Sequence, residues 1–313
     1  MNEKVKVYGG QAVIEGVMMR SRRAMAVAVR DPAGEIQIIS HRLTGPLRGR
    51  IANIPFLRGV VGLIDAFGIG YLSLMYSGAV AAGEDAEYDE PVAWGMIGLS
   101  VALGIGMFFI LPALIGQGAE NWMGISGGMG NIVEGIARLI VVLVYIWLIG
   151  FMPDVRRIYG YHGDAHKTIH AFEANAELTP LSVARFPREH PRCGTAILLV
   201  VVVMSVLIFA ALGPLPLLMR LATRLILLPV LAGLAYEYLR ITAKNVDNSI
   251  VRLLVLPSLA LQRLTTREPD EKMLAVAITA FEAMRKIDGA VGDAGGDQRR
   301  HQHQAGAAER AHQ

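Results

Sequence analysis

Long apolar segments separated by shorter basic ones run through most of the chain. The segments 92–116 and 195–219 contain no charged residue. A bilayer core about 30 Å thick needs roughly 20 apolar helical residues, and in lipid only a helix can satisfy so many backbone groups internally. Both segments therefore predict transmembrane helices.

Two further apolar segments contain charges and still predict spans. Segment 132–152 has Glu134 and Arg138 in its first two turns, four residues apart, where they can pair on one helix face or extend toward the headgroups. Segment 221–239 carries its charges near its two ends and a proline in the middle, which neighbouring helices can tolerate at a kink.

Segment 56–82 is ambiguous. It contains Arg58, Asp65 and five glycines. Its polar residues Asp65, Ser73 and Ser77 would form a loose stripe along a helix. The segment could span the bilayer, re-enter it, or lie in the interface.

The distribution of Lys and Arg decides between these topologies. Basic residues crowd into 1–58, 153–194 and the chain from 240 onward, whereas 117–131 and 213–217 contain none. Four spans, with the ambiguous segment left out, place every basic region on the cytoplasmic side. The pattern therefore predicts an α-helical polytopic membrane protein with about four transmembrane helices, one interfacial or re-entrant helix, and both termini in the cytoplasm.

The more polar segments divide the chain further. Apolar-rich stretches at 24–30 and 35–41 flank a turn at 31–34, which predicts a small N-terminal β hairpin. A helix is predicted at about 163–176, and an amphipathic helix is predicted to start at Pro269. The expected organisation is a cytoplasmic N-terminal β unit at 1–55, the interfacial or re-entrant helix at 56–82, two transmembrane helices at 92–152, a cytoplasmic His/Cys segment at 153–194, two transmembrane helices at 195–239, cytoplasmic amphipathic helices at 240–288 and a disordered tail at 289–313.

The composition also indicates a protein that works in lipid. The 313 residues are 53% hydrophobic and 18% charged, and the mean hydropathy is +0.42. The single cysteine, Cys193, excludes an intramolecular disulfide. The pI near 9.0 arises from bases beside apolar segments, where membrane topology requires them. We therefore expect the lipid bilayer as a partner, and not nucleic acid.

Histidines and the lone cysteine form the most specific chemical pattern. His162, His166 and His170 recur every four residues, so a helix would stack them along one face, and His190 and Cys193 follow downstream. Imidazole and thiolate are ligands that zinc prefers, in tetrahedral geometry. One interpretation is a zinc site made by His162, His166, His190 and Cys193. The other is that the histidines are hydrogen-bonded residues at a membrane-proximal helix end and that Cys193 begins the next span.

Several longer motifs accompany these residues. They are 9–20 (GGQAVIEGVMMR), 161–163 (YHG) with 166–169 (HKTI), 190–195 (HPRCGT), 236–237 (YE) and 262–269 (QRLTTREP). With these motifs the chain resembles the YqhQ-like family of bacterial membrane proteins, a domain of unknown function often labelled a predicted metal-dependent enzyme. The resemblance runs from Val7 to about Ala283. It implies a location in the bacterial cytoplasmic (inner) membrane and a candidate metal site, but no particular reaction.

The family resemblance also bears on the choice of reaction. In the family pattern the stretch after Tyr161 reads His-Gly-Ala-Glu-His, which is similar to the inverted zincin motif, where two histidines bind zinc and the carboxylate is the general base. His162 and His166 match this pattern, but Ala165 stands where the carboxylate belongs. Asp164 is one residue earlier, which on a helix is a rotation of about 100°. The resemblance therefore favours metal binding over peptide hydrolysis.

Other residues are weaker candidates for the same chemistry. They are Asp164, Glu173 and Glu177 as catalytic bases, and Glu15, His170 and Glu237 as further metal ligands. Each also has an ordinary structural interpretation. The three bases read as solvated helix positions, Glu15 as a strand end, His170 as an outer-shell or surface residue, and Glu237 as the partner of nearby Arg240.

Two functions remain open at this stage. The first is an integral membrane protein whose cytoplasmic His/Cys subdomain is ordered by zinc or another divalent transition metal ion and presents a surface to a protein partner. The alternative is a metal-dependent membrane hydrolase acting on a lipid-like or membrane-protein substrate. A structural site is closed whereas a catalytic site keeps an open coordination position, so that position distinguishes them. The sequence predicts neither the oligomeric state nor whether the protein is an enzyme.

Overall fold

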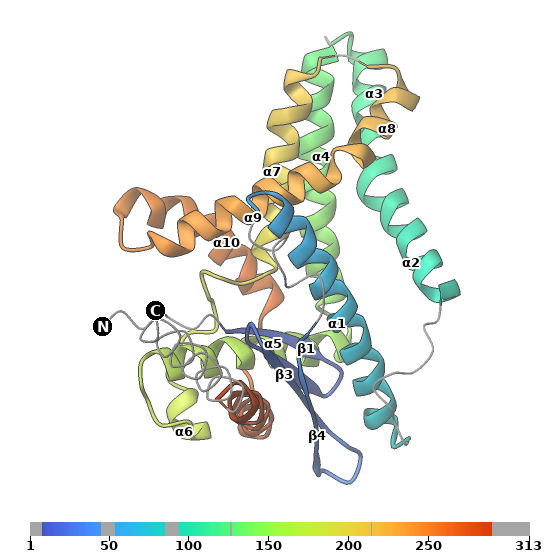
Figure 1. The fold of residues 1–313 in the computed structure, drawn as a ribbon. Helices are drawn as coiled ribbons and strands as arrows, with labels where there is room; N and C mark the ends of the chain where they lie inside the picture. Colours follow the sequence, from blue (N-terminus) through green and yellow to red (C-terminus); the bar gives the residue numbers. More distant parts are fainter. Residues whose placement is uncertain (1–7, 45–53, 85–93, 126, 214, 290–313) are drawn as a thin grey trace, which may run out of the picture.

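A small sheet with covering helices is joined to a longer bundle of apolar helices (Figure 1). The computed structural model describes residues 8–44, 54–84, 94–125, 127–213 and 215–289. The predicted tail at 289–313 lies almost entirely outside the described residues.

The N-terminal β unit is an antiparallel meander. Its strands are β1 (Gly9–Val13), β2 (Gly16–Arg20), β3 (Ala24–Arg30) and β4 (Ile36–Arg42), hydrogen-bonded in the order β1-β2-β3-β4. The predicted hairpin is confirmed as β3 and β4. Its turn contains Gly34 at φ +92°, a conformation that glycine adopts without steric cost. The strands β1 and β2 come from the 9–20 motif and extend the unit beyond the predicted hairpin.

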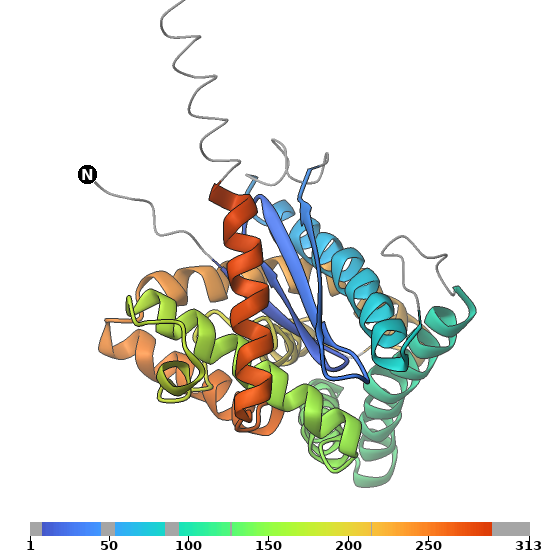
Figure 2. The ribbon, with the colours of Figure 1, turned by 90° about the horizontal axis from the view of Figure 1, so that it is seen from below.

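The sheet is buried on both faces, as the alternation of β3 shows. Ala24, Ala26 and Ala28 face a core built with α5 (Pro153–Glu173) and the helix at 271–289. Met25, Val27 and Val29 lie in a second core together with Tyr76 and Val80 of α1 (Leu57–Ala82). Figure 2 shows the sheet between α1 on one side and α5 with the C-terminal helix on the other.

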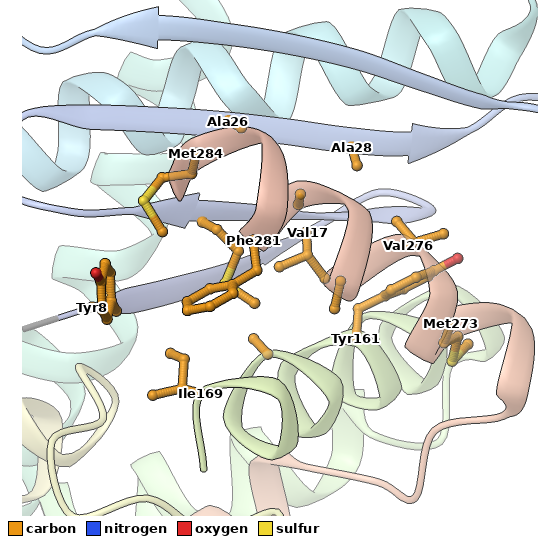
Figure 3. Close-up of a cluster of buried hydrophobic side chains, with 14 of the residues drawn as sticks. Tyr8, Val17, Ala26, Ala28, Tyr161, Ile169, Met273, Val276, Phe281 and Met284 are labelled. Atoms are coloured by element: carbon orange, nitrogen blue, oxygen red, sulfur yellow. The ribbon is translucent and has the colours of Figure 1, made fainter. Parts of the chain in front are cut away.

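The core on the α5 side positions the histidine-bearing helix. Tyr161, Ile169 and Phe281 lie in this core with the sheet residue Val17 (Figure 3). A Cβ atom added to Gly10 would lie 2.7 Å from Cβ of Ala165, so only glycine lets β1 approach α5 this closely. This contact holds α5 against β1 at Ala165, the residue that precedes His166.

Three described helices are long and apolar enough to cross a membrane. They are Leu57–Ala82, Ile97–Met123 and Gly128–Ile149. A bent pair at 45°, α8 (Leu217–Ile226) with α9 (Leu228–Lys244), makes a fourth if it acts as one span. The second candidate is made of α2 (Trp94–Ile105), the π-helix η3 (Gly106–Ile110) and α3 (Leu111–Met123), and the third is α4 (Gly127–Ile149). The shorter labelled helices are α6 (Pro180–Val183), α7 (Ala196–Ala211) and α10 (Ser249–Thr265).

Two of these helices differ from the sequence-based expectation. The first is α1, predicted to be interfacial or re-entrant, which is long enough to span and also packs one face against the sheet. Its Asp65 pairs with Arg20 of β2 at 2.9 Å. The second is α7, which is shorter than the predicted span 195–219. It ends before Gly213, whose φ of +72° leaves the helical region.

The bundle carries a buried charge cluster as well as an apolar outer surface. Leu99, Leu103 and Leu207 on its outer surface are each more than 60% exposed. Inside, the predicted pair of Glu134 and Arg138 is confirmed at 2.7 Å. Further contacts to Glu134 come from Arg224 of α8, at 3.0 Å from its Nε.

Candidate metal centre

The helix α5 stacks three histidines on one face, as the spacing predicts. It begins ten residues before the expected start, because Pro153 suits the first helical position and Asp154 in the first turn interacts favourably with the helix dipole. The rings of His162 and His166 are 4.5 Å apart. Across from them runs the segment that leads to α7 and carries Cys193.

Three of the four predicted ligands converge. Nε2 of His162 lies 3.3 Å from Sγ of Cys193. Each of His162, His166 and Cys193 offers one ligand atom, and these three atoms lie within 4.8 Å of one another. All three side chains are buried, at 9%, 3% and 6% exposure. This group is called the His/His/Cys triad below.

Backbone carbonyls orient both imidazoles of the triad. Nδ1 of His162 donates to the carbonyl oxygen of Thr265 at 2.9 Å, and Nδ1 of His166 donates to that of Arg188 at 2.6 Å. A carbonyl oxygen can only accept, so the proton of each neutral ring resides on Nδ1. In each neutral ring the lone pair is therefore on Nε2, which is the arrangement of metal-ligating histidines, and in His162 this nitrogen is the atom that contacts Cys193. The donor set of two imidazole nitrogens and one sulfur suits zinc.

Charge within the triad favours the form of cysteine that binds metal. Burial raises the pKa of the Cys193 thiol, but hydrogen bonds and charge from His162 and His166 in their protonated form outweigh burial and lower the pKa well below its usual value. In that form the protons occupy the nitrogen atoms that a metal ion would bind, so metal binding would displace them. The hydroxyl of Thr195 also lies 3.0 Å from Sγ. The thiolate is the metal ligand, so less free energy is needed to deprotonate Cys193 on binding.

His190, the fourth predicted ligand, lies beside the triad in a second group with His170 and Glu173. Nδ1 of His190 accepts a hydrogen bond from the backbone N–H of Arg192 at 3.1 Å, so a neutral ring carries its proton on Nε2. Burial lowers the pKa of His190 to about 4, which keeps the ring neutral. A protonated Nε2 has no lone pair for a metal ion, so His190 does not complete the triad in this orientation.

The second group is held together by hydrogen bonds and charge. Nε2 of His170 contacts the carbonyl oxygen of Glu189 at 2.9 Å, and Glu173 pairs with Arg192. Nε2 of His190 points to the same carboxylate at 3.7 Å and has no hydrogen-bond partner among the described residues. His170 therefore lies outside the triad, as its ranking as an outer residue predicted.

One residue that sequence reasoning missed holds His190 in place. The side chain of Gln262 accepts from the backbone N–H of His190 at 2.7 Å and donates to its carbonyl oxygen at 3.0 Å. Gln262 is fully buried. It belongs to the 262–269 motif, so its place in that motif was the only signal in the sequence.

The remaining candidates lie away from the triad. Glu15 sits at the β1–β2 turn with φ +51° and pairs with Arg157, while Glu237 pairs with Arg58 of α1 rather than with Arg240. Glu177 is exposed in the loop after α5. None of these three acids is grouped with the triad among the described residues.

Asp164 lies on the side of α5 opposite the histidines. It is fully buried, near Thr168 and Asp270. Burial, followed by the charge of Asp270, raises the pKa of Asp164 well above its usual value. The interpretation of Asp164 as a solvated position is therefore wrong, and its position gives it no contact with the triad.

We expect Asp164→Asn to stabilise the protein at mildly alkaline pH. The unfolded chain loses this proton near the usual Asp pKa of about 3.9, whereas the folded chain retains it to higher pH. The folded state thus binds more protons in that window, and the free energy of unfolding falls as pH rises through it. Asparagine removes this loss. Thermal unfolding of both proteins should show the variant's advantage at alkaline pH and its disappearance in acid, and an advantage independent of pH would contradict the explanation.

Comparison with known proteins identifies relatives but no reaction. A family model described as "Protein of unknown function (DUF1385)" matches residues 54–287. The protein named "Uncharacterized protein YqhQ" from Bacillus subtilis (strain 168) is 30% identical over 297 residues, covering 90% of this chain and 93% of that protein. No solved structure matches the chain. The matches cover most of the chain, so the YqhQ-like resemblance is confirmed and the chain belongs to the DUF1385 family.

Proposed function

We propose that this chain is a multi-span protein of the bacterial cytoplasmic membrane that carries a catalytic-type metal centre on its cytoplasmic part. The observation that carries the proposal is the His/His/Cys triad, which brings together three ligand atoms from the described residues. A tetrahedral ion held by these three would have its fourth position open. Catalytic zinc sites have three protein ligands and one open position, whereas structural sites have four. The reaction class that this arrangement favours is metal-assisted hydrolysis.

The orientation in the membrane rests on charge and on the apolar helices. Three described helices, or four with the bent pair α8–α9, suit a bilayer by length and composition. The four-span topology uses α7 as a span and leaves α1 at the interface, and in it the segments rich in Lys and Arg lie on the same side. That topology places α5, the triad and both termini in the cytoplasm. Cys193 precedes the first residue of α7 by only a short turn, so the centre would lie close to the membrane surface. A lipid-like or membrane-protein substrate fits this location.

The protonation states of His190 and Glu173, which lie beside the triad, indicate what each side chain could do in a reaction. A divalent metal ion at the triad would supply Lewis acidity toward water or a substrate oxygen. His190, neutral with its proton on Nε2, can donate a hydrogen bond to negative charge that develops on the substrate. Glu173, with Oε2 at 3.7 Å from that nitrogen, is the carboxylate placed to accept a proton.

The position of Ala165 supports this assignment of roles. Its side chain is fully buried against β1, where a Cβ on Gly10 would approach it to 2.7 Å. A glutamate at 165 would therefore have to enter the core between α5 and the sheet. In this chain the zincin base would have no room at its usual position, and a base would have to come from elsewhere.

A structural centre is the second candidate, and burial of all three ligands favours it. In that case a metal ion would tie α5 to the segment entering α7 and would order a cytoplasmic surface for a protein partner. His190 would then have to turn and supply the fourth ligand, giving up the hydrogen bond from the backbone of Arg192.

Cobalt substitution separates these functions. We expect the purified protein loaded with Co²⁺ to show the strong visible absorption of a four-coordinate cobalt–thiolate site, because Cys193 is a ligand. Thiocyanate or cyanide should then shift the bands by occupying the open position. Absorption bands that do not shift when these anions are added would indicate a closed structural site. The absence of a cobalt–thiolate band would overturn the metal centre altogether. Glu177→Gln, in an exposed loop, is the matched control and should leave the spectrum unchanged.

A further inference from the structure

An arginine-lined cavity of about 570 Å³ lies next to α5, on a different side from the triad. Its walls come from the turn between α4 and α5, the first turns of α5, the segment before His190, and the segment from Arg267 into the start of the helix at 271–289. The charged residues that line it are Arg156, Arg157, Arg188, Arg267, Glu268 and Asp270. Neither the proposed metal chemistry nor the family description uses this cavity.

The cavity retains excess positive charge after its ion pairs are counted. Glu268 is neutralised from outside by Lys167 at 2.5 Å, and Arg157 is neutralised by Glu15. Asp270 accepts a hydrogen bond from the N–H of Met273 at 2.8 Å, in the first turn of the C-terminal helix.

After these pairs are counted, the cavity lining has three positively charged guanidinium groups, those of Arg156, Arg188 and Arg267, and one negatively charged carboxylate, that of Asp270. Arg156 has no ion-pair partner in the part of the chain that the structure describes, and Arg188 only reaches Glu189 at the 4.0 Å limit. Arg267 donates to three backbone carbonyls, which leaves its charge in place. Such planar groups match the oxygens of phosphate in a bidentate manner. The nearby N-terminus of α5 adds its dipole in the same sense.

The position of the cavity indicates where the phosphate comes from. Phe151 lines it, two residues after the candidate span α4 ends at Ile149. Trp147 and Phe151 are 50% and 65% exposed and contact each other edge to face at 4.9 Å. Exposed aromatic residues at the end of a span are typical of the membrane–water interface, where lipid headgroups lie. A basic cavity at this depth faces anionic headgroups.

We propose that this cavity binds the phosphate group of an anionic membrane lipid. The binding does not require the metal centre, but the two are neighbours. Arg188 lines the cavity, and its carbonyl oxygen holds Nδ1 of His166. At Gly163 an added Cβ would lie 2.4 Å from the carbonyl oxygen of Arg267. The backbone of Arg267, a residue that lines the cavity, is therefore in close contact with α5.

The test measures lipid binding by the full chain in a neutral detergent. The probes are phosphatidylglycerol and phosphatidylcholine, each titrated separately, and inorganic phosphate is used as a competitor. We expect preference for phosphatidylglycerol, and we expect Arg156→Gln with Arg188→Gln to weaken its binding by about tenfold or more, since each removes charge-assisted hydrogen bonds. Arg252→Gln, an exposed arginine on α10, is the matched control and should bind as the unmodified chain does.

The possible results separate the two proposals. Equal phosphatidylglycerol binding by the double variant and the unmodified chain would overturn the lipid site. Competition by inorganic phosphate at concentrations like those of the lipid would overturn the lipid as the source and indicate a site for free phosphate. Cys193→Ser should lose metal yet retain lipid binding, so failure of the metal centre leaves this result intact. Circular dichroism of each variant confirms that its helices are retained.

Discussion

Cys193→Ser protein is expected to contain almost no zinc after purification, whereas the unmodified chain should contain about one equivalent. The sulfur atom lies 3.3 Å from Nε2 of His162, and its lowered pKa supplies the thiolate that the ion needs. A serine hydroxyl keeps the shape but does not ionise at neutral pH. Elemental analysis by mass spectrometry, with protein concentration from amino-acid analysis, gives the ratio directly.

The histidines provide the matched comparison. His166→Ala should lose zinc as Cys193→Ser does. In the unmodified chain the carbonyl oxygen of Arg188 holds Nδ1 of His166, and Nε2 then carries the lone pair that would bind the ion. His170→Ala, one turn further along the same face, should retain it, since Nε2 of His170 is engaged with Glu189. Full zinc content in the Cys193 and His166 variants would remove the basis of the centre. Loss in all three alike would indicate general unfolding of α5 instead.

The histidine pattern was readable because helical spacing alone stacks residues four apart. The same spacing gave the pairing of Glu134 with Arg138. The hairpin at β3 and β4 was readable from the turn residues 31–34 between two strand-like stretches. The exclusion of His190 from the triad could not be read from the sequence. It depends on a local hydrogen bond from Arg192 and on Gln262, which is 72 positions away in the chain.

The apolar segments were also readable, but their partners were not. Hydropathy indicates that 56–82 can be helical and apolar, yet only the sheet shows why this helix carries Tyr76 and Val80 on one face. Likewise, Asp164 looks like any polar position on a helix. Its burial arises from the helix at 271–289, more than a hundred residues later, which closes over that side of α5.

The charge cluster inside the bundle joins α4 to α8 through the carboxylate of Glu134 and to η3 through Arg138. Glu134 of α4 accepts from Arg138 at 2.7 Å and from Arg224 of α8 at 3.0 and 3.1 Å, and Arg138 also donates to the carbonyl oxygen of Phe108 in the π-helix η3 at 3.0 Å. Glu134 and Arg224 are each 1% exposed. Two buried guanidinium groups thus depend on the same acid for their charge balance.

We therefore expect Glu134→Gln to lower the free energy of unfolding by about 3 kcal/mol or more, because a buried charge left without its partner costs far more than the pair contributes. Glu237→Gln breaks a similar ion pair, with Arg58, at a site where both side chains are partly exposed, and should cost about 1 kcal/mol or less. Denaturant titration of the detergent-solubilised proteins, followed by circular dichroism, measures both. If the two substitutions prove equally mild, Glu134 does not hold α4 and α8 together. Substituting Arg224 as well as Glu134 should then recover little, whereas in the proposed arrangement removal of the second charge restores part of the lost stability.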